Sequence, residues 1–500
     1  MKTFCALLGA LVFGFLAGEA GAAQSRSPWE HSVVTLEVTR KQYDYLQPWT
    51  KRVAHVQKTG TVIGPREILT TADSMADQTM IRLQKGGRGK WWPGELRWID
   101  YHANLAVVSA AEAAFWKDLR PVPLAASVPG KGSVQLIRWR NGNLEIRKTE
   151  INRLIVKGGK LSFLEHLHLE IDSEINGTGW AEAIVSGSKL IGMVSSKEEH
   201  GCTVLPSSFI RSCLEARKTE PYRGLGYFDF VWQRAENPAT LKHLKLVGEP
   251  RGVIVIDSRA KPSQAQVLKR HDIILQIDGF DIDTQGDYKD PAHGNLLLEN
   301  LATRNKRAGD KIHIKIWRDG AGQGVLYELP PVEYSVDLVP EAVFDQEPEY
   351  LLMGGLLFQP LTEPYLQSWG NDWRRKAPFR LSYYKLEKPA PEKPSLVVLS
   401  LVLPDAHNLG YQDSRYLVVN KLNGRRVTRL ADLLEAIKHP VEGFHILEFR
   451  DGDSMQRMVL DAGETEAATR RVLQRYGIEK DHVIASPPLV LKAGVASNGK

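Results

Sequence analysis

Three residues of a predicted strand have the types and spacing that bind a metal ion. His166, His168 and Glu170 alternate along the chain with apolar residues between them. Because successive side chains of a strand point to opposite faces, the two imidazoles and the carboxylate share one face. Such a set could hold Zn²⁺ and leave one position open for water. The alternative is a half-exposed strand with a polar outer face. Since no fourth ligand can be named, we predict no metal and no cofactor.

Hydroxyls and imidazoles of the same region could supply a nucleophile and its base. Acyl transfer needs a hydroxyl or thiol activated by a base, with a third group that orients the imidazole. The candidate hydroxyls are Thr178, Ser173, Ser186 and Ser188, and the candidate imidazoles are His102, His166 and His168. Catalytic triads are defined by geometry rather than by chain order, so the sequence leaves such a triad open. We favour the other interpretation, ordinary loop serines and strand histidines.

The elements around these residues belong to a long chain of average composition. Its 500 residues predict about three domains, because a domain usually holds about 100 to 200 residues. Hydrophobic residues make up 43% and charged residues 25%, which excludes collagen-like and wholly disordered proteins. The net charge of +6 is spread along the chain without a basic run, so nucleic-acid binding is not expected.

The first 23 residues differ from the rest. Lys2 precedes an apolar stretch, residues 4–17, and small residues follow up to residue 23, a pattern typical of a cleavable secretory signal. A membrane anchor is the alternative, but about 14 apolar residues fall short of the roughly 20 that a spanning helix needs. We therefore predict an exported protein, periplasmic or extracellular, with no stable membrane insertion.

Cys202 and Cys213 would remain after cleavage of the signal. An oxidising compartment permits a disulfide between them. Two buried free thiols are the alternative, because a disulfide requires a short separation of the alpha carbons that spacing cannot supply.

Residues 33–214 consist mostly of short strand-like runs broken by glycine and asparagine, which suggests a barrel or sandwich. A helix is expected to begin near Ser207. The remainder contains a degenerate repeat: residues 224–228, 274–279 and 316–320 are echoed by residues 354–358, 419–424 and 449–452. Leucine spacing predicts one helix in each copy, at residues 296–301 and 430–437.

At this point the chain resembles the HtrA/Deg family of serine proteases, which join a chymotrypsin-like double barrel to PDZ domains. Residues 60–64 with 68–72, 100–108 and 171–180 look like the segments that present the family's His, Asp and Ser. The resemblance implies a mostly β fold, a chymotrypsin-like double β-barrel followed by two PDZ-like α+β domains. The expected units are a signal peptide (1–23), an N-terminal segment (24–50), a trypsin-like domain (51–217), a first PDZ domain (221–335), a second PDZ-like domain (345–483) and a disordered tail (484–500).

The catalytic residues of the family do not carry over. Asp73 stands at the position of the general base His, Asn104 at that of the Asp, and Trp180 at that of the nucleophilic Ser. The side chain of tryptophan has no nucleophilic hydroxyl or thiol group. Glu182 follows in the turn that supplies the oxyanion donors, and would bring negative charge to the place where negative charge develops. The resemblance therefore implies a pseudoprotease.

The PDZ-like copies keep the residues that peptide binding requires. A PDZ domain adds a peptide as a strand to a sheet edge and captures its carboxylate with backbone N–H groups of a glycine-containing loop. By resemblance, Gly224, Leu225, Gly226 and Tyr227 form the first loop, faced by Leu297, Leu298 and Leu301, and Gly354, Gly355, Leu356 and Leu357 form the second. The alternative is that the chain itself blocks one or both sites.

We therefore expect an adaptor, chaperone or regulator in envelope protein quality control. The candidate partners are protein or peptide C-termini, unfolded segments, an active protease of the same family, and further copies of the chain in a homo-oligomer. Two other functions stay open: an active endopeptidase that uses non-standard residues, and a structural envelope protein with blocked PDZ grooves.

Overall fold

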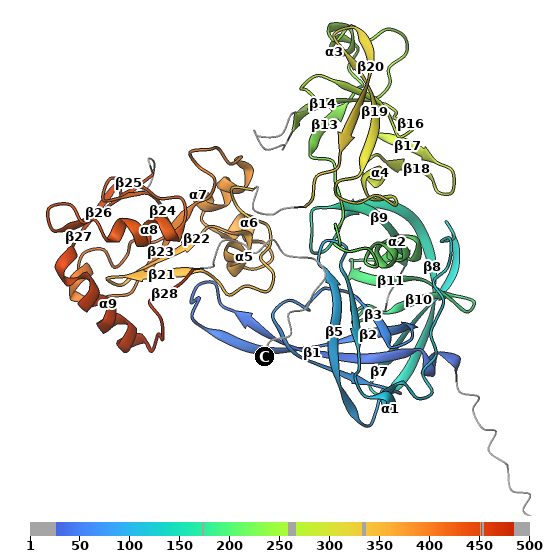
Figure 1. Ribbon diagram of the computed structural model, residues 1–500, viewed down its shortest axis with the longest axis horizontal. Coiled ribbons are helices and arrows are strands. Elements are labelled where there is room, and N and C mark those ends of the chain that lie inside the picture. Colours follow the sequence, from blue (N-terminus) through green and yellow to red (C-terminus); the bar gives the residue numbers. More distant parts are fainter. Residues whose placement is uncertain are drawn as a thin grey trace, which may run out of the picture.

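The computed structural model describes residues 27–172, 175–258, 267–332, 337–450, 452 and 455–484. The predicted signal peptide and residues 485–500 of the predicted disordered tail lie outside this range. The described chain is mostly β and consists of two closed barrels followed by two further β-sheet units (Figure 1). This confirms the predicted fold class.

The first barrel closes in the order β1-β2-β3-β6-β5-β4. It is preceded by the 3-10 turn Pro28–His31, and the short helix α1 (Ala113–Trp116) follows it. Its strands are β1 (Val33–Tyr43), β2 (Lys51–Gly64), β3 (Glu67–Thr70), β4 (Gln78–Gln84), β5 (Trp91–Asp100) and β6 (Leu105–Ser109). The barrel therefore begins at Val33, inside the segment 24–50 that we expected to be separate. The reason is that β1 and β2 stay paired up to Tyr43 and Lys51, beyond the barrel wall.

The second barrel closes in the order β10-β11-β12-β9-β8-β7. Its strands are β7 (Gly132–Arg140), β8 (Asn143–Gly158), β9 (Glu165–Asp172), β10 (Ala183–Ser186), β11 (Lys189–Lys197) and β12 (Gly201–Pro206). Helix α2 (Ser207–Ala216) follows and begins at the predicted residue. Its buried Phe209, Ile210 and Cys213 join apolar residues of both barrels in one core.

Residues 224–329, which the sequence predicts to be PDZ-like and which are called the first PDZ-like unit, form a sheet in the order β13-β14-β15-β19-β20 with a separate hairpin β17-β18. Its elements are β13 (Phe230–Arg234), α3 (Pro238–His243), β14 (Val253–Ser258), β15 (Ile273–Ile277), β16 (Phe280–Asp281), β17 (Asp287–Asp290), β18 (Gly294–Leu297), α4 (Asn300–Thr303), β19 (Lys311–Arg318) and β20 (Ala321–Glu328). The helix predicted for residues 296–301 is wrong. Leu296 pairs with Tyr288 in the hairpin, so the helix begins only at Asn300.

The second PDZ-like unit, residues 350–483, is a sheet in the order β27-β26-β24-β23-β22-β21-β28. Its strands are β21 (Tyr350–Met353), β22 (Leu356–Pro360), β23 (Val397–Val402), β24 (Leu417–Leu422), β25 (Arg425–Arg426), β26 (Phe444–Phe449), β27 (Arg457–Asp461) and β28 (His482–Val483). Helix α8 (Leu430–Ile437) lies at the predicted residues, and helix α9 (Ala462–Tyr476) was not predicted. The repeat is visible in the turns Asp278-Gly279 and Asn423-Gly424, which both have positive φ.

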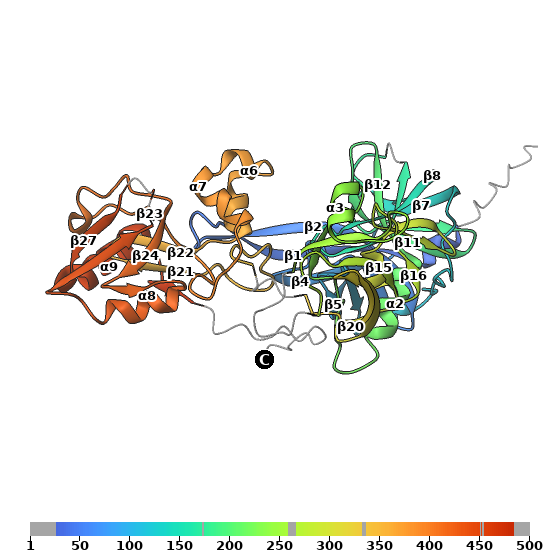
Figure 2. The ribbon, with the colours of Figure 1, turned by 90° about the horizontal axis from the view of Figure 1, so that it is seen from above.

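Short helices are inserted between β22 and β23 of the second PDZ-like unit. They are α5 (Glu363–Leu366), α6 (Trp373–Lys376) and α7 (Phe379–Ser382), with 3-10 turns at Gln367–Trp369 and Tyr383–Leu386. A further 3-10 turn, Ala406–Asn408, follows β23. The long β1-β2 hairpin extends from the first barrel to this unit (Figures 1 and 2). There the Gln359 amide donates to the carbonyl of Tyr45 at 2.9 Å, and Trp49 contacts Tyr350 edge-on. The hairpin therefore ties the N-terminal barrel to the C-terminal unit.

Candidate functional site

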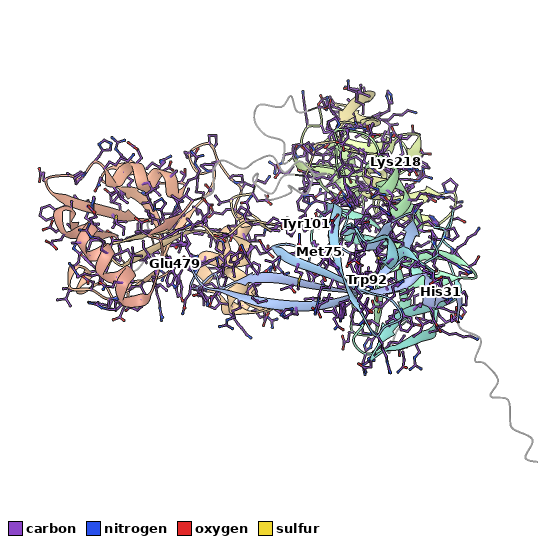
Figure 3. The ribbon with its side chains drawn as sticks, turned by 60° about the horizontal axis from the view of Figure 1, so that its bottom comes forward. His31, Met75, Trp92, Tyr101, Lys218 and Glu479 are labelled. Atoms are coloured by element: carbon purple, nitrogen blue, oxygen red, sulfur yellow. The ribbon has the colours of Figure 1, made fainter. Side chains whose placement is uncertain are left out.

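The structure brings Asp73 and Asn104 together. Asp73 follows β3 and Asn104 precedes β6, two strands that pair in the first barrel. The Asp73 backbone N–H donates to the Asn104 side-chain oxygen at 2.8 Å, and both residues are buried. Met75 and Tyr101, labelled in Figure 3, mark the two loops. Strand pairing thus places these two positions side by side.

Trp180 joins them from the second barrel. Its carbonyl accepts from the Thr59 backbone N–H at 2.8 Å, which links the two barrels. Lys160, in the loop between β8 and β9, connects Trp180 to Asp73. Its ammonium lies 2.7 Å from Asp73 Oδ2 and 5.4 Å from the centre of the Trp180 ring. The three positions therefore surround one point between the barrels, with a lysine among them.

Lys58 is a second cation at this point and is fully buried. Its ammonium donates to the Thr71 carbonyl at 2.6 Å and to the Asp73 carbonyl. Burial lowers the pKa of Lys58 to about 7, although the charge of Asp73 opposes the shift. No hydroxyl is among the hydrogen-bond partners of this ammonium in the described part of the chain. Its geometry is that of a structural clamp on the Asp73 loop.

Glu182 occupies the backbone donors of the turn at Trp180. Its Oε2 accepts from the N–H of Trp180 at 2.9 Å and of Gly179 at 3.1 Å. The side chain is buried, and burial raises the pKa of Glu182. Arg138 lies 3.5 Å from the other carboxylate oxygen and donates to the Gly177 carbonyl at 2.6 Å. The turn is therefore held by a carboxylate of the chain itself.

The charged side chains of this cluster are engaged with one another or with backbone groups. Asp73 bonds Lys160, Lys58 bonds carbonyls, and Glu182 bonds amides. Sequence reasoning missed Lys58 and Lys160. Lys58 could have been found from the sequence, because a lysine next to the glycine-containing, buried half of strand β2 is unusual. Lys160 lies in a loop, and no sequence pattern distinguishes it.

Where the chain is described, most of the hydroxyls that the sequence offered as substitute nucleophiles form no hydrogen bond with Asp73, Asn104 or Trp180. Thr178 donates to the Ile175 carbonyl, whereas Ser186 and Ser188 are exposed near the turn between β10 and β11. Ser173 lies outside the described residues. His102 Nδ1 lies 3.1 Å from the hydroxyl of Ser162, which sequence reasoning did not select. Burial lowers the pKa of His102.

His166 and His168 are buried rather than on a polar outer face. The His166 ring stacks on Phe209 of helix α2 at 4.2 Å and on the His168 ring at 4.1 Å. Burial lowers the pKa of His166 to about 4, which keeps the imidazole neutral. Glu170 instead pairs with Arg153 at 2.7 Å. Within the described ranges, no group of three or more His, Cys, Asp or Glu residues has the arrangement of a metal site.

The two cysteines are free thiols and both are buried. Cys202 lies on β12 with its sulfur 3.2 Å from the Thr178 hydroxyl, and Cys213 lies on α2. Burial raises the pKa of Cys213 to about 12. Of the two alternatives, the structure shows buried free thiols.

The first predicted peptide-capture loop packs against the second barrel. Leu225 is buried in the core that contains α2, and Tyr227 contacts Phe163 edge-on at 5.4 Å. Gly224 has φ 71°, and its carbonyl accepts from Ala308, while Gly226 bridges to Pro331. The facing residues Leu297, Leu298 and Leu301 belong to a core that includes Val156 and Leu167 of the barrel. The loop directly precedes β13, which in the described chain pairs only with β14.

The second predicted loop is the turn of the β21-β22 hairpin. Gly354 and Gly355 form the turn, with Leu356 paired to Met353 and Leu357 to Leu352. The Gly354 N–H donates to Thr469 of α9 at 2.8 Å, and its carbonyl accepts from the Asn408 amide at 2.9 Å. Strand β22 lies between β21 and β23, and β28 covers the outer edge of β21. The peptide-binding role of both loops stays a prediction.

Part of the chain matches a family of PDZ domains, and most of the chain is similar to plant proteins named as Do-like proteases. A family model described as PDZ domain matches residues 339–483. The putative protease Do-like 13 of Arabidopsis thaliana is 24% identical over 456 residues, which cover 90% of this chain and 87% of the relative. The chloroplastic protease Do-like 2 of the same plant is 26% identical over 465 residues, covering 90% and 74%. The mitochondrial protease Do-like 4 is 26% identical over 459 residues, covering 90% and 84%.

Two solved structures show weaker similarity. The HtrA-type protease AlgW with tripeptide aligns with a TM-score of 0.47 and 17% identity, over 62% of this chain and 98% of that chain. The serine endoprotease from Yersinia pestis aligns with a TM-score of 0.40 and 16% identity, over 61% and 97%.

Proposed function

We propose that this chain, which belongs to the HtrA/Deg family of Do-like proteases with a PDZ domain, is a catalytically inactive member that binds peptides. It acts as an adaptor, chaperone or regulator in envelope protein quality control, with an active protease of the same family as a candidate partner. Peptide recognition resides in the first PDZ-like unit.

The hydrogen bonds of Glu182 carry the pseudoprotease proposal. A serine protease stabilises its oxyanion with backbone N–H groups of the turn that carries the nucleophile. Here the N–H groups of Gly179 and Trp180 donate to a buried carboxylate. A substrate oxyanion would have to displace that carboxylate and then lie beside its negative charge. The turn is therefore closed to acyl chemistry even before the missing nucleophile is considered.

The position of β13 supports peptide binding by the first PDZ-like unit. Strand addition needs an edge whose backbone N–H and C=O groups have no strand partner. Strand β13 follows the Gly224–Tyr227 loop and ends the described sheet. The Trp232 indole on this strand donates to Glu299, beside α4, at 2.7 Å. The loop, the edge strand and the helix thus lie in the order that peptide capture requires.

Casein digestion by the purified protein without residues 1–23 tests the pseudoprotease proposal, with fluorophosphonate labelling of the same sample. We expect neither turnover nor label. Variant Ser162→Ala is the control, because the contact between His102 and Ser162 is the observation that favours the second candidate, an active endopeptidase. Turnover or labelling that disappears in Ser162→Ala would establish that second candidate instead.

Binding of peptides with a free C-terminal carboxylate tests the other half of the proposal. Amidation or backbone N-methylation of the peptide should abolish binding, because both remove main-chain recognition. In Gly226→Ala the new Cβ would lie 2.7 Å from Leu329 Cβ and 3.2 Å from the Ala308 nitrogen, so the loop must shift. We expect about tenfold weaker binding, or about 1.4 kcal/mol.

The matched control is Gly322→Ala, because a Cβ at Gly322 meets no atom within 4 Å. Equal losses in both variants would contradict the assignment to this loop. If none of the peptides with a free C-terminal carboxylate binds while the fold is intact, the third function, a structural envelope protein with blocked grooves, would remain.

Export to the periplasm or the extracellular space is part of the proposal and is supported by the N-terminal sequence pattern. The relatives include proteins named as chloroplastic and mitochondrial. None of the helices in the described part of the chain is long and apolar enough to cross a bilayer. Cell fractionation with an antibody to the mature chain tests the compartment.

A further inference from the structure

A cavity of about 630 Å³ lies between helix α2 of the second barrel and the first PDZ-like unit. Arg211 and Ser212 line it from α2, and Lys218, labelled in Figure 3, lies two residues after the end of this helix. Arg223, Arg304 and Arg307 line it from the other side. Cavities of this size hold small ligands. Arginines from α2, from the connecting segment and from the residues after α4 thus converge on this space, which the proposed function does not use.

Arg307 is the decisive residue because it is buried without a counter-charge. The residue is only 7% exposed, and its Nε has no hydrogen-bond partner. Its other nitrogens donate to the Ser212 hydroxyl at 2.7 Å and to the Lys306 carbonyl. Within the described residues, no carboxylate lies within ion-pair distance of this guanidinium. A buried, unpaired charge is costly, so the site favours an added anion.

The carboxylates around the cavity are already engaged by other cations. Asp310 pairs with Arg223 at 2.8 Å and Asp290 with Arg304 at 3.1 Å. Glu215 pairs with Lys218 at 2.9 Å. None of the three pairs neutralises Arg307 or Arg211. The local excess of charge is therefore positive.

Further hydrogen-bonding groups complete the site. Ser208 and His293 also line the cavity, and the His293 Nδ1 is buried without a partner. Guanidinium groups bind carboxylates and phosphates through two parallel hydrogen bonds, and hydroxyls add further donors. We propose that this cavity binds a small ligand bearing an oxyanion, carboxylate or phosphate, whose charge is paired with Arg307 and Arg211.

Such a ligand would join the barrel to the first PDZ-like unit. Arg211 and Ser212 belong to α2, whereas Arg304 and Arg307 follow α4. A ligand bound only when the two units are packed together stabilises that packing by mass action. Binding should therefore raise the unfolding temperature and slow hydrogen exchange in α2 and in residues 300–310.

Calorimetric titration of the mature full-length chain with inorganic phosphate and, separately, citrate tests the proposal, with chloride at matched ionic strength as the reference. We expect one saturable site per chain for at least one anion, and the stronger of the two identifies the chemistry as phosphate or carboxylate. Variant Arg307→Met should lower the affinity by about tenfold or more.

Two further variants keep the test decisive. Arg211→Gln, at a partly exposed position, should also weaken binding, and it decides the outcome if Arg307→Met does not fold. Arg251→Gln removes the same charge outside the cavity, where its side chain donates to the Val247 and Glu249 carbonyls, and should bind as wild type. Absence of saturable binding, or equal binding by all variants, overturns the proposal.

Discussion

The two PDZ-like units carry the same kind of glycine-containing loop, but the strand that follows it has a different place in each sheet. In the first unit, β13 ends the described sheet, whereas in the second unit β22 lies between two neighbours. Only a strand with an unpaired edge can accept a peptide as an added strand. The loop motif therefore does not define a peptide site unless the sheet leaves that strand at its edge.

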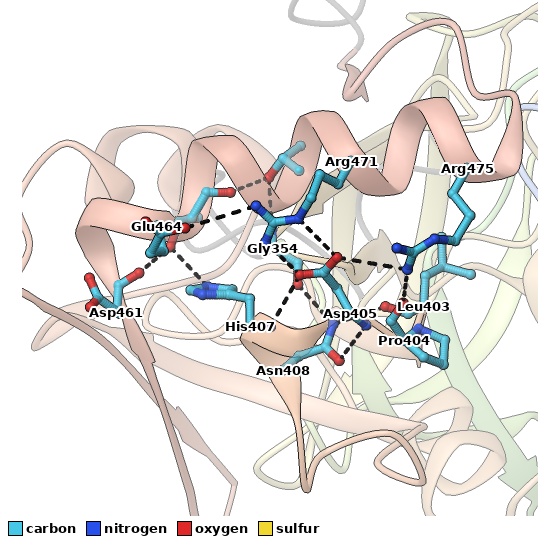
Figure 4. A network of polar contacts seen from close by, with 12 residues as sticks. Gly354, Leu403, Pro404, Asp405, His407, Asn408, Asp461, Glu464, Arg471 and Arg475 are labelled. Atoms are coloured by element: carbon cyan, nitrogen blue, oxygen red, sulfur yellow. Dashed lines mark hydrogen bonds and ion pairs between the residues drawn. The ribbon is translucent and has the colours of Figure 1, made fainter.

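The second unit closes itself with elements that the first unit lacks in the described chain. Helix α9 packs on the turn of the hairpin and β28 pairs with β21. Figure 4 shows Arg471 and Arg475 reaching from α9 to the buried Asp405, and the Asn408 side chain beside Gly354. We therefore expect the glycines of the second unit to serve stability, and those of the first to serve binding.

The largest expected effect is that of Gly355→Ala on the second unit. Gly355 has φ 91°, and a Cβ there would collide with the Asn408 amide and the Leu403 carbonyl. We expect a loss of about 3 kcal/mol in the free energy of unfolding, from backbone strain and overpacking together. Gly224→Ala in the first unit has a similar φ of 71° but meets nothing within 4 Å, so it should cost about 1 kcal/mol. Chemical denaturation measures both.

Equal losses in the two glycine variants would show that φ alone decides, and that the tight packing of the second turn contributes nothing.

A smaller effect is expected from Thr469→Val. The Thr469 hydroxyl accepts from the Gly354 N–H at 2.8 Å, and valine has nearly the same shape without an acceptor. The buried N–H would lose its partner, at a cost of about 1 to 2 kcal/mol in unfolding free energy. Thr469→Ser keeps the hydroxyl and is the control. If valine and serine cost the same, packing rather than the hydrogen bond holds α9 on the turn.

The contact of the first unit with the barrel should weaken as pH rises. Burial raises the pKa of Glu165 on β9 to about 7, and the charge of Glu299 near α4 adds to the shift. The folded-state pKa of Glu165 lies above its unfolded value. The contribution of Glu165 to stability is therefore fully present below about pH 4.5 and is lost as the pH rises through about 7. Thermal unfolding midpoints from pH 5 to pH 8 should fall more for wild type than for Glu165→Gln. Parallel curves would contradict this expectation.

The second unit should respond to pH in the opposite sense and at lower pH. Hydrogen bonds from Arg471 lower the pKa of Asp405 to about 2. Its contribution to stability is therefore present above about pH 4 and is lost as pH falls toward 2. The difference in unfolding midpoint between wild type and Asp405→Asn should shrink over that range. A constant difference would indicate that Asp405 acts by packing rather than by charge.

Much of the architecture could be predicted because it depends on local patterns. The leucines of residues 430–437 lie on α8, and Ser207 begins α2, as expected. Residues 296–301 have the same leucine spacing, but pairing of Leu296 with Tyr288 draws the start of that segment into a hairpin. A short segment with helical leucine spacing therefore forms a strand instead when a neighbouring strand can pair with it.

The candidate site was predictable in composition but not in arrangement. The replacements Asp73, Asn104 and Trp180 were read from the resemblance, and Glu182 was expected near the oxyanion turn. The partners Lys58 and Lys160 were not found, because β2 and the loop before β9 meet the Asp73 loop only after both barrels have closed.

The sequence by itself determined which residues occupy the former catalytic positions and which segments repeat, because residue types and local periodicity are written along the chain. Only the tertiary structure decided that Glu182 closes the turn at Trp180, that β22 is enclosed while β13 ends the described sheet, and that Arg307 has no counter-charge among the described residues. Each of these depends on distances between residues far apart in the chain, and such distances are set by how strands pair and units pack.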